Sequence, residues 1–150
     1  MAWLYTRELP SSDIAAIAFD GLCNLWLLAD RREIPMLGNI IVDAMRDLVV
    51  ERKKLPTGQV AQIYANTVPS SGIRRFIVWL ISRTGSTKIT SDSKPYKHWP
   101  AEALGEILQA VWAVQEKEKG KRKRTTQEEI ARKNMCAFHT HEQGVKCQGA

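Results

Sequence analysis

The stretch LWLLADRREIPMLGNIIVD, which occupies residues 25–43, decides the fold of this chain. On both sides of its centre, apolar residues recur at intervals of three and four, which is the period of a helix with one buried face. A short break lies between Asp30 and Pro35. Pro35 is well placed in the first turn of the second helix, because its ring fixes the backbone angle φ there. The pattern predicts two consecutive amphipathic helices, over residues 14–30 and 35–51.

The remainder of the chain also has helical patterning, and we predict an all-α fold of about six helices. A break at Leu55–Pro56 precedes a short helix that contains Ile63 and Tyr64. The next helix, from residue 73 to about 83, has Arg74, Arg75 and Arg83 on its outer face, although residues 76–81 also suit a strand. Its expected buried residues are Ile73, Phe76, Ile77 and Leu80.

Two further helices follow a polar loop at residues 84–98. Trp99–Pro100 opens the first, and its expected buried face is Leu104, Ile107, Leu108, Val111 and Val114. Thr126 and Glu129 have the spacing of a capping box, which predicts a short final helix to about Asn134. The chain has five tryptophans, for which packing in the core is the expectation: Trp3, Trp26, Trp79, Trp99 and Trp112.

Composition describes an ordinary globular protein. The chain has 150 residues, of which 44% are hydrophobic and 25% are charged, and a chain of that length can bury a core of its own. No apolar run approaches the roughly 20 residues that a membrane helix needs, so we expect no membrane partner. The three cysteines and the absence of a secretory pattern at the N-terminus predict a reducing compartment, either nucleus or cytoplasm.

The net charge of +6 belongs mainly to the tail. Residues 1–116 hold 13 Lys/Arg and 12 Asp/Glu, whereas residues 117–150 hold nine and four. A near-neutral globular part argues against nucleic acid as a partner of the whole domain. The tail contains a basic run, which is typical of nuclear import or phosphate contact but is also common as a solvated segment. The run consists of Lys121, Arg122, Lys123 and Arg124.

The C-terminal tail contains four residues that can bind zinc: Cys136, His139, His141 and Cys147. Zinc takes four nitrogen or sulfur ligands in a tetrahedron, and Cys-x2-His is a usable spacing. A closed Cys2His2 site is therefore one interpretation. The other is a terminal segment that holds no cofactor and docks on the core through Phe138.

We predict that the chain is not an enzyme, because its residues form no catalytic set. Cys136 with His139 or His141 could make a nucleophile and base, but enzymes of that kind take such residues from distant points of a rigid scaffold. Cys23 lies among apolar residues and is expected in the core. Three carboxylates are interpreted as helix-end and surface groups: Asp30, Asp43 and Asp47.

Several short motifs in the correct order resemble single-domain BTB/POZ proteins of filamentous fungi. Leu28-Ala29-Asp30 and Ile34-Pro35 are similar to a signature of the helical half of that domain, and Asn39 and Asp43 fit its next segment. The remaining similar segments are residues 3–6, 9–10, 55–56, 63–67, 70–75 and 136–141. Arg32 stands where the family usually has an aromatic residue.

The resemblance implies three pieces. Residues 1–51 correspond to the C-terminal half of a BTB domain, residues 52–118 to a helical extension, and residues 119–150 to a basic linker, a short helix and the Cys/His tail. The β-sheet half of the domain has no counterpart, so either the chain is a shortened relative or its sequence begins late. We expect the helical hairpin to expose an apolar face, with Trp26 and Leu37 as contacts for a partner.

The resemblance also implies a function in protein–protein interaction. BTB domains self-associate and serve as adaptors for cullin-type ubiquitin ligases, so the expected partner is a second copy or such a ligase. The alternative from the residues is a nuclear protein whose basic, zinc-binding tail contacts nucleic acid.

Overall fold

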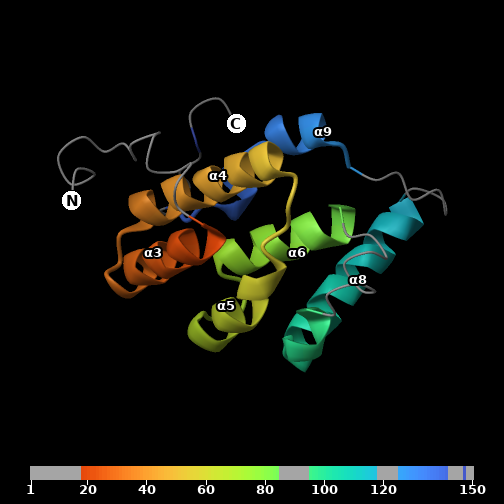
Figure 1. Ribbon diagram of the computed structural model, residues 1–150, viewed down its shortest axis with the longest axis horizontal. Helices are drawn as coiled ribbons and strands as arrows, with labels where there is room; N and C mark the ends of the chain where they lie inside the picture. The colour runs from red at the N-terminus through yellow and green to blue at the C-terminus, as the bar shows by residue number, and fades with distance from the viewer. Residues whose placement is uncertain (1–17, 85–94, 118–124, 142–146, 148–150) are drawn as a thin grey trace.

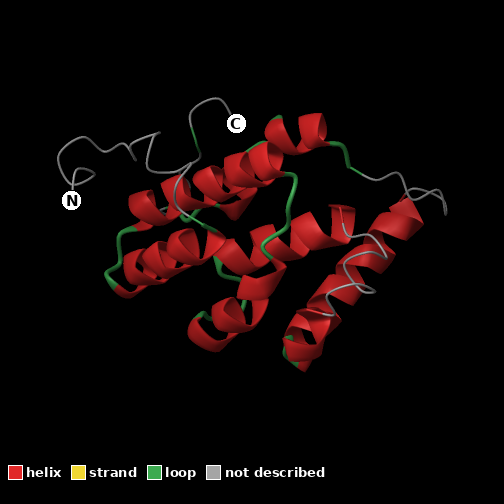
Figure 2. Cartoon of the chain, in the orientation of Figure 1, coloured by secondary structure: helices red, strands yellow, loops and turns green. Residues whose placement is uncertain are grey.

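The computed structural model describes residues 18–84, 95–117, 125–141 and 147, which form helices and the turns between them (Figure 1). No β-strand occurs in that part of the chain, so the predicted all-α fold is confirmed (Figure 2). Among the helices described there, none combines the length and apolar character that crossing a membrane requires. In chain order the elements are α3 (Phe19–Arg31), α4 (Pro35–Arg52), η1 (Thr57–Gln59), α5 (Val60–Asn66), α6 (Gly72–Thr84), η2 (Pro95–His98), α8 (Ala101–Lys117), α9 (Gln127–Ala131) and η3 (Met135–Phe138).

Helices α3 and α4 lie side by side as an antiparallel hairpin (Figure 1). A turn with Glu33 in the left-handed region (φ 53°) joins them, and Pro35 occupies the first turn of α4. The predicted second helix is therefore confirmed. Helix α3, which covers most of the predicted first helix, begins at Phe19 after an extended backbone at Ala18 (ψ 164°). Residues 14–17 of the prediction lie outside the described residues.

One cluster of buried side chains extends from the hairpin to the C-terminal segment. Helix α4 contacts α3, α6, α9 and η3, so its apolar residues are covered by other elements on several sides. Cys23 is fully buried in this cluster, as predicted. The largest fully buried side chains include Leu22, Ile41, Met45, Leu48, Ile63, Phe76, Ile77, Leu80 and Ile130.

Trp26 and Leu37 do not form the exposed contact face of the hairpin that we expected, although Leu28 and Met36 beside them are exposed. Trp26 is only 4% exposed and Leu37 only 7%, so neither side chain offers a free surface to a partner. The reason is that η1, α5, α6, α9 and η3 pack against the hairpin. Phe138 and Thr140 of the C-terminal segment lie beside Trp26 along one pocket.

The prediction that Arg74 lies on the outer face of α6 is wrong, because this residue is buried (3% exposed). Its guanidinium donates to the Tyr64 carbonyl oxygen (2.9 Å) and to Thr67 Oγ1 (2.8 Å), at the C-terminal end of α5. It also pairs with Glu102 of α8 at 2.7 Å. The side chain joins three helices and satisfies carbonyl groups that the end of a helix leaves without partners.

The buried face of α8 is the predicted one only in part, since Ile107 and Val114 are buried as expected but the two leucines are not. Ala103 and Ile107 are buried, whereas Leu104 (41%) and Leu108 (46%) are exposed. Helix α8 lies at the edge of the molecule and packs mainly on α6 (Figure 1), so only one narrow stripe can be covered. Trp112, which we expected in the core, is also exposed (55%).

Candidate metal centre

Two local hydrogen-bonded motifs position the segment that carries the Cys and His residues. The capping box is confirmed: Thr126 Oγ1 accepts from the backbone N–H of Glu129, whose carboxylate accepts from Thr126 N–H at 2.7 Å. The helix it begins, α9, ends at Ala131, slightly earlier than predicted. Asn134 then accepts a hydrogen bond from the backbone N–H of Cys136 (2.8 Å) and starts η3.

Phe138 anchors this segment in the core. Its ring lies edge-on to Phe76 with centroids 5.6 Å apart, and 5.5 Å from the ring of Trp79. Its carbonyl passes so close to the start of α6 that a Cβ atom on Gly72 would lie 2.1 Å from the carbonyl oxygen. Only glycine therefore allows the segment to pass here. With Phe138 buried, η3 and the next residues, His139 and Thr140, are held against α4.

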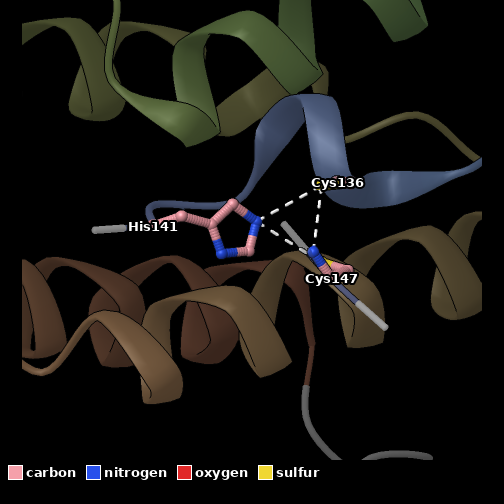
Figure 3. Close-up of side chains that lie close together, drawn as sticks. All are labelled: Cys136, His141 and Cys147. Atoms are coloured by element: carbon pink, nitrogen blue, oxygen red, sulfur yellow. Dashed lines mark hydrogen bonds between the residues drawn. The ribbon is translucent and has the colours of Figure 1, made fainter. Parts of the chain in front are cut away.

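Three of the four predicted ligands converge, as Figure 3 shows. His141 Nε2 lies 3.4 Å from Cys136 Sγ and 3.4 Å from Cys147 Sγ. The backbone N–H of Cys147 also points to Cys136 Sγ, at 3.4 Å. The three ligand atoms lie within 4.8 Å of one another. The fold therefore brings Cys136, His141 and Cys147 into a group that could hold a metal ion.

The spacing of these atoms fits zinc. Zn–S bonds of about 2.3 Å and Zn–N bonds of about 2.0–2.1 Å in a tetrahedron place sulfur and nitrogen about 3.5 Å apart. Both observed S···N distances are 3.4 Å, which matches the separation that zinc requires of these two pairs. Thiolates are soft ligands and imidazole is of intermediate character, and a set of both favours zinc over calcium or magnesium, which prefer oxygen.

The fourth predicted ligand, His139, lies between this group and α4. Its Nδ1 is 3.1 Å from Cys147 Sγ, and its Nε2 is 3.2 Å from Asp43 Oδ1. Thr140, between the two histidines, forms two hydrogen bonds with the side chain of Asn39: its N–H donates at 2.8 Å and its carbonyl oxygen accepts at 3.0 Å. The segment is therefore attached to α4 at two consecutive residues, through the side chain of His139 and the backbone of Thr140.

Asp43 and Asn39 are the site residues that sequence reasoning did not identify. Asp43 was interpreted as a surface carboxylate, and it is partly exposed, but one of its oxygens faces His139. The available signal was that the two residues stand four apart, on one face of α4. Nothing in the local pattern connects that face to a segment about a hundred residues later.

The surroundings of Cys147 favour its protonated thiol in the absence of a metal. The pKa of the Cys147 thiol is raised, first by its burial and then by its hydrogen bond to Cys136 and the negative charges of Cys136 and Asp43. A nucleophilic cysteine requires the opposite, a lowered pKa. A bound metal ion would instead favour the thiolate, because a coordinated thiol is deprotonated by the metal.

A pocket of about 350 Å³ lies next to the centre, between the hairpin and the C-terminal segment. Trp26 and Gly38 form its apolar wall on the hairpin side, and Phe138 and Thr140 close the other side. The pocket therefore depends on the segment that the metal ligands flank.

The basic run at residues 121–124 lies outside the described residues, and its predicted roles stay predictions. Trp3 lies outside them as well. The chain was compared with known protein families, with curated proteins and with solved structures, and none of the three comparisons found a match.

Proposed function

We propose that this chain is a non-catalytic helical protein in which a structural zinc ion fastens the C-terminal segment. One observation carries the proposal: Cys136, His141 and Cys147 place their ligand atoms within 4.8 Å of one another. Structural zinc sites contribute directly to folding, because the ion replaces packing that a short segment cannot supply.

A structural role suits this site better than a catalytic one. A catalytic zinc keeps one position open for water or substrate, whereas four Cys and His ligands close the tetrahedron. The tail offers four such residues. The raised pKa of Cys147 also speaks against a nucleophilic thiol.

The test is the zinc content of protein purified without chelators, measured by mass spectrometry of the metal. We expect about one zinc per chain. The double variant Cys136→Ala with His141→Ala should lose it. His98→Ala is the matched control, because His98 is exposed in η2 and should keep the zinc. Protein that holds no zinc and retains its helical circular dichroism would contradict the proposal.

A second function, binding a protein partner, is favoured by the exposed face of α8. Leu104, Leu108 and Trp112 follow one another at intervals of four, so they form an apolar row along one side of the helix. We propose that a second copy of this chain covers the row, since one helix face can pair with itself across a two-fold axis. The resemblance to BTB/POZ proteins, which self-associate, supports the same partner.

Sedimentation velocity tests this second function. We expect the wild type to dimerise at micromolar concentrations and Leu108→Gln to shift it toward the monomer. Val68→Gln is the control, because Val68 is more exposed (68%) but lies in the loop before α6. A monomeric wild type throughout that range would exclude the dimer, and binding of a cullin-type ligase would then be tested with the same variants.

A further inference from the structure

His139 is placed to complete the metal centre, because its two ring nitrogens face different groups. Nδ1 lies 3.1 Å from Cys147 Sγ, at the edge of the group of three ligands. Nε2 lies 3.2 Å from Asp43 Oδ1, on α4. The ring is 90% buried, so few other orientations are open to it.

The carboxylate determines which nitrogen can bind a metal. A neutral imidazole carries one N–H and one lone pair, and an ionised carboxylate can only accept a hydrogen bond. Asp43 therefore favours the form of His139 with the proton on Nε2, which leaves the lone pair of Nδ1 directed to the ligand group. Histidines that bind metals commonly donate their second N–H to such a carboxylate, which fixes the ring and increases its basicity.

The backbone beside His139 is also attached to α4. Asn39 lies four residues before Asp43 on α4, and its side chain forms both hydrogen bonds with Thr140. The peptide between the two histidines therefore cannot slide along α4 without losing these bonds. His139 and His141 both depend on α4 for their positions, although neither belongs to it.

We infer that His139 is the fourth zinc ligand, through Nδ1, and that Asp43 is its positioning residue. The inference rests on the proposed zinc site and adds that the site is complete only when the C-terminal segment lies on α4. Docking of the segment and zinc affinity are then coupled: each strengthens the other by the same factor.

The principal experiment compares zinc affinities by competition with a chromophoric chelator. Loss of a carboxylate that orients a metal-binding histidine typically weakens the metal about 10- to 100-fold, and we expect that for Asp43→Ala. Asp43→Asn retains an acceptor oxygen and should recover part of the loss. Asp47→Ala is the matched control, because Asp47 lies one turn further along α4, is 63% exposed and pairs with Arg46; its affinity should equal that of the wild type.

A spectroscopic measurement separates positioning from a general loss of stability. In the zinc-loaded protein, nitrogen-15 NMR of His139 should show a metal-bound Nδ1 and a protonated Nε2. In Asp43→Ala that pattern should weaken while the signals of His141 remain those of a bound ligand.

The outcomes distinguish the inference from the proposal on which it rests. If Asp43→Ala and His139→Ala bind zinc as tightly as the wild type while Cys136→Ala does not, zinc is bound but His139 is not the fourth ligand, and the inference fails. A protonated Nδ1 of His139 in the loaded protein also overturns it. If the wild type binds no zinc, the proposed function fails with it.

Discussion

At the scale of single residues, Arg74 is a charged side chain on which the stability of the fold depends. Its guanidinium bonds to the C-terminal end of α5 and to Glu102 of α8, and it lies 4.3 Å from the centre of the Tyr64 ring. The sequence placed it on the outer face of α6 because arginine is seldom buried. It is buried here because the carbonyl groups at the end of α5 need donors.

We expect Arg74→Met to lower the free energy of unfolding by about 3 kcal/mol, the lower end of the range for breaking a buried ion pair, since Glu102 remains partly solvated. The loss should appear in urea unfolding followed by circular dichroism. Arg75→Met is the control: Arg75 is adjacent and exposed, so its effect should stay within about 0.5 kcal/mol. Equal effects of the two variants would mean that the buried bonds contribute little.

Cys23 predicts how stability responds to alkaline pH. Burial, and then the charge of Asp20, raise the pKa of this thiol from 9.0 to about 11. Below pH 9 the thiol is protonated in both states, so its full contribution to stability is present. Between these values the unfolded chain releases the proton first, and stability falls as the pH rises.

The contribution of Cys23 to this fall should reach about 2 kcal/mol by pH 11, at about 1.4 kcal/mol per pH unit of pKa difference. Urea unfolding at a series of pH values measures it. Cys23→Ala should be less stable at neutral pH, because it leaves a cavity, but its stability should decline less steeply above pH 9. A decline as steep as that of the wild type would show that other groups cause it. Tyr64, whose pKa is also raised by burial and by Glu106, would be the first to examine.

At the scale of elements, α8 shows why a helical period does not determine which face is buried. The predicted face joined Leu104 and Leu108 to Ile107 and Val114, whereas the buried stripe passes through Ala103, Ile107 and Val114. Only that stripe is covered, because α8 packs on α6 and α5 along one side and leaves the two leucines outside. The choice depends on the surface of the neighbouring helix, which no local pattern contains.

Two glycines test how η3 is attached to α6. Gly72→Ala places a methyl group against the carbonyl oxygen of Phe138, so η3 must move away. We expect a loss of about 1–3 kcal/mol, as for other overpacked contacts. In Gly105→Ala the new methyl group meets nothing within 4 Å, and stability should rise by about 0.5–1 kcal/mol because alanine favours the helix.

Thermal unfolding of both glycine variants, with and without zinc, provides the measurement. A Gly72→Ala protein as stable as the wild type would show that η3 is not held against α6 in solution. Gly105→Ala also serves as the control for any general effect of adding a methyl group to a helix.

At the scale of the whole molecule, the sequence was informative wherever one residue acts on its near neighbours. Pro35 predicted the start of α4, and the pair Thr126 and Glu129 predicted the start of α9, since both signals are local. The grouping of Cys136, His141 and Cys147 also followed from short spacing.

What the sequence could not supply was long-range pairing. The contacts of Asn39 with Thr140 and of Asp43 with His139 span 101 and 96 residues. They depend on how α4, α6 and η3 pack together, and on Gly72 leaving room for Phe138. For the same reason, the covering of Trp26 and Leu37 by the chain itself could not be foreseen from the pattern of the hairpin.

The short spacing of the predicted ligands has a consequence for the unfolded chain. All of them lie within residues 136–147, so even an unfolded tail can wrap around an ion. Metal bound to the unfolded state offsets the stabilisation that the ion gives to the folded one. The melting temperature should therefore respond less to zinc than the affinity alone would suggest. The difference that remains measures what α4 adds through Asn39 and Asp43.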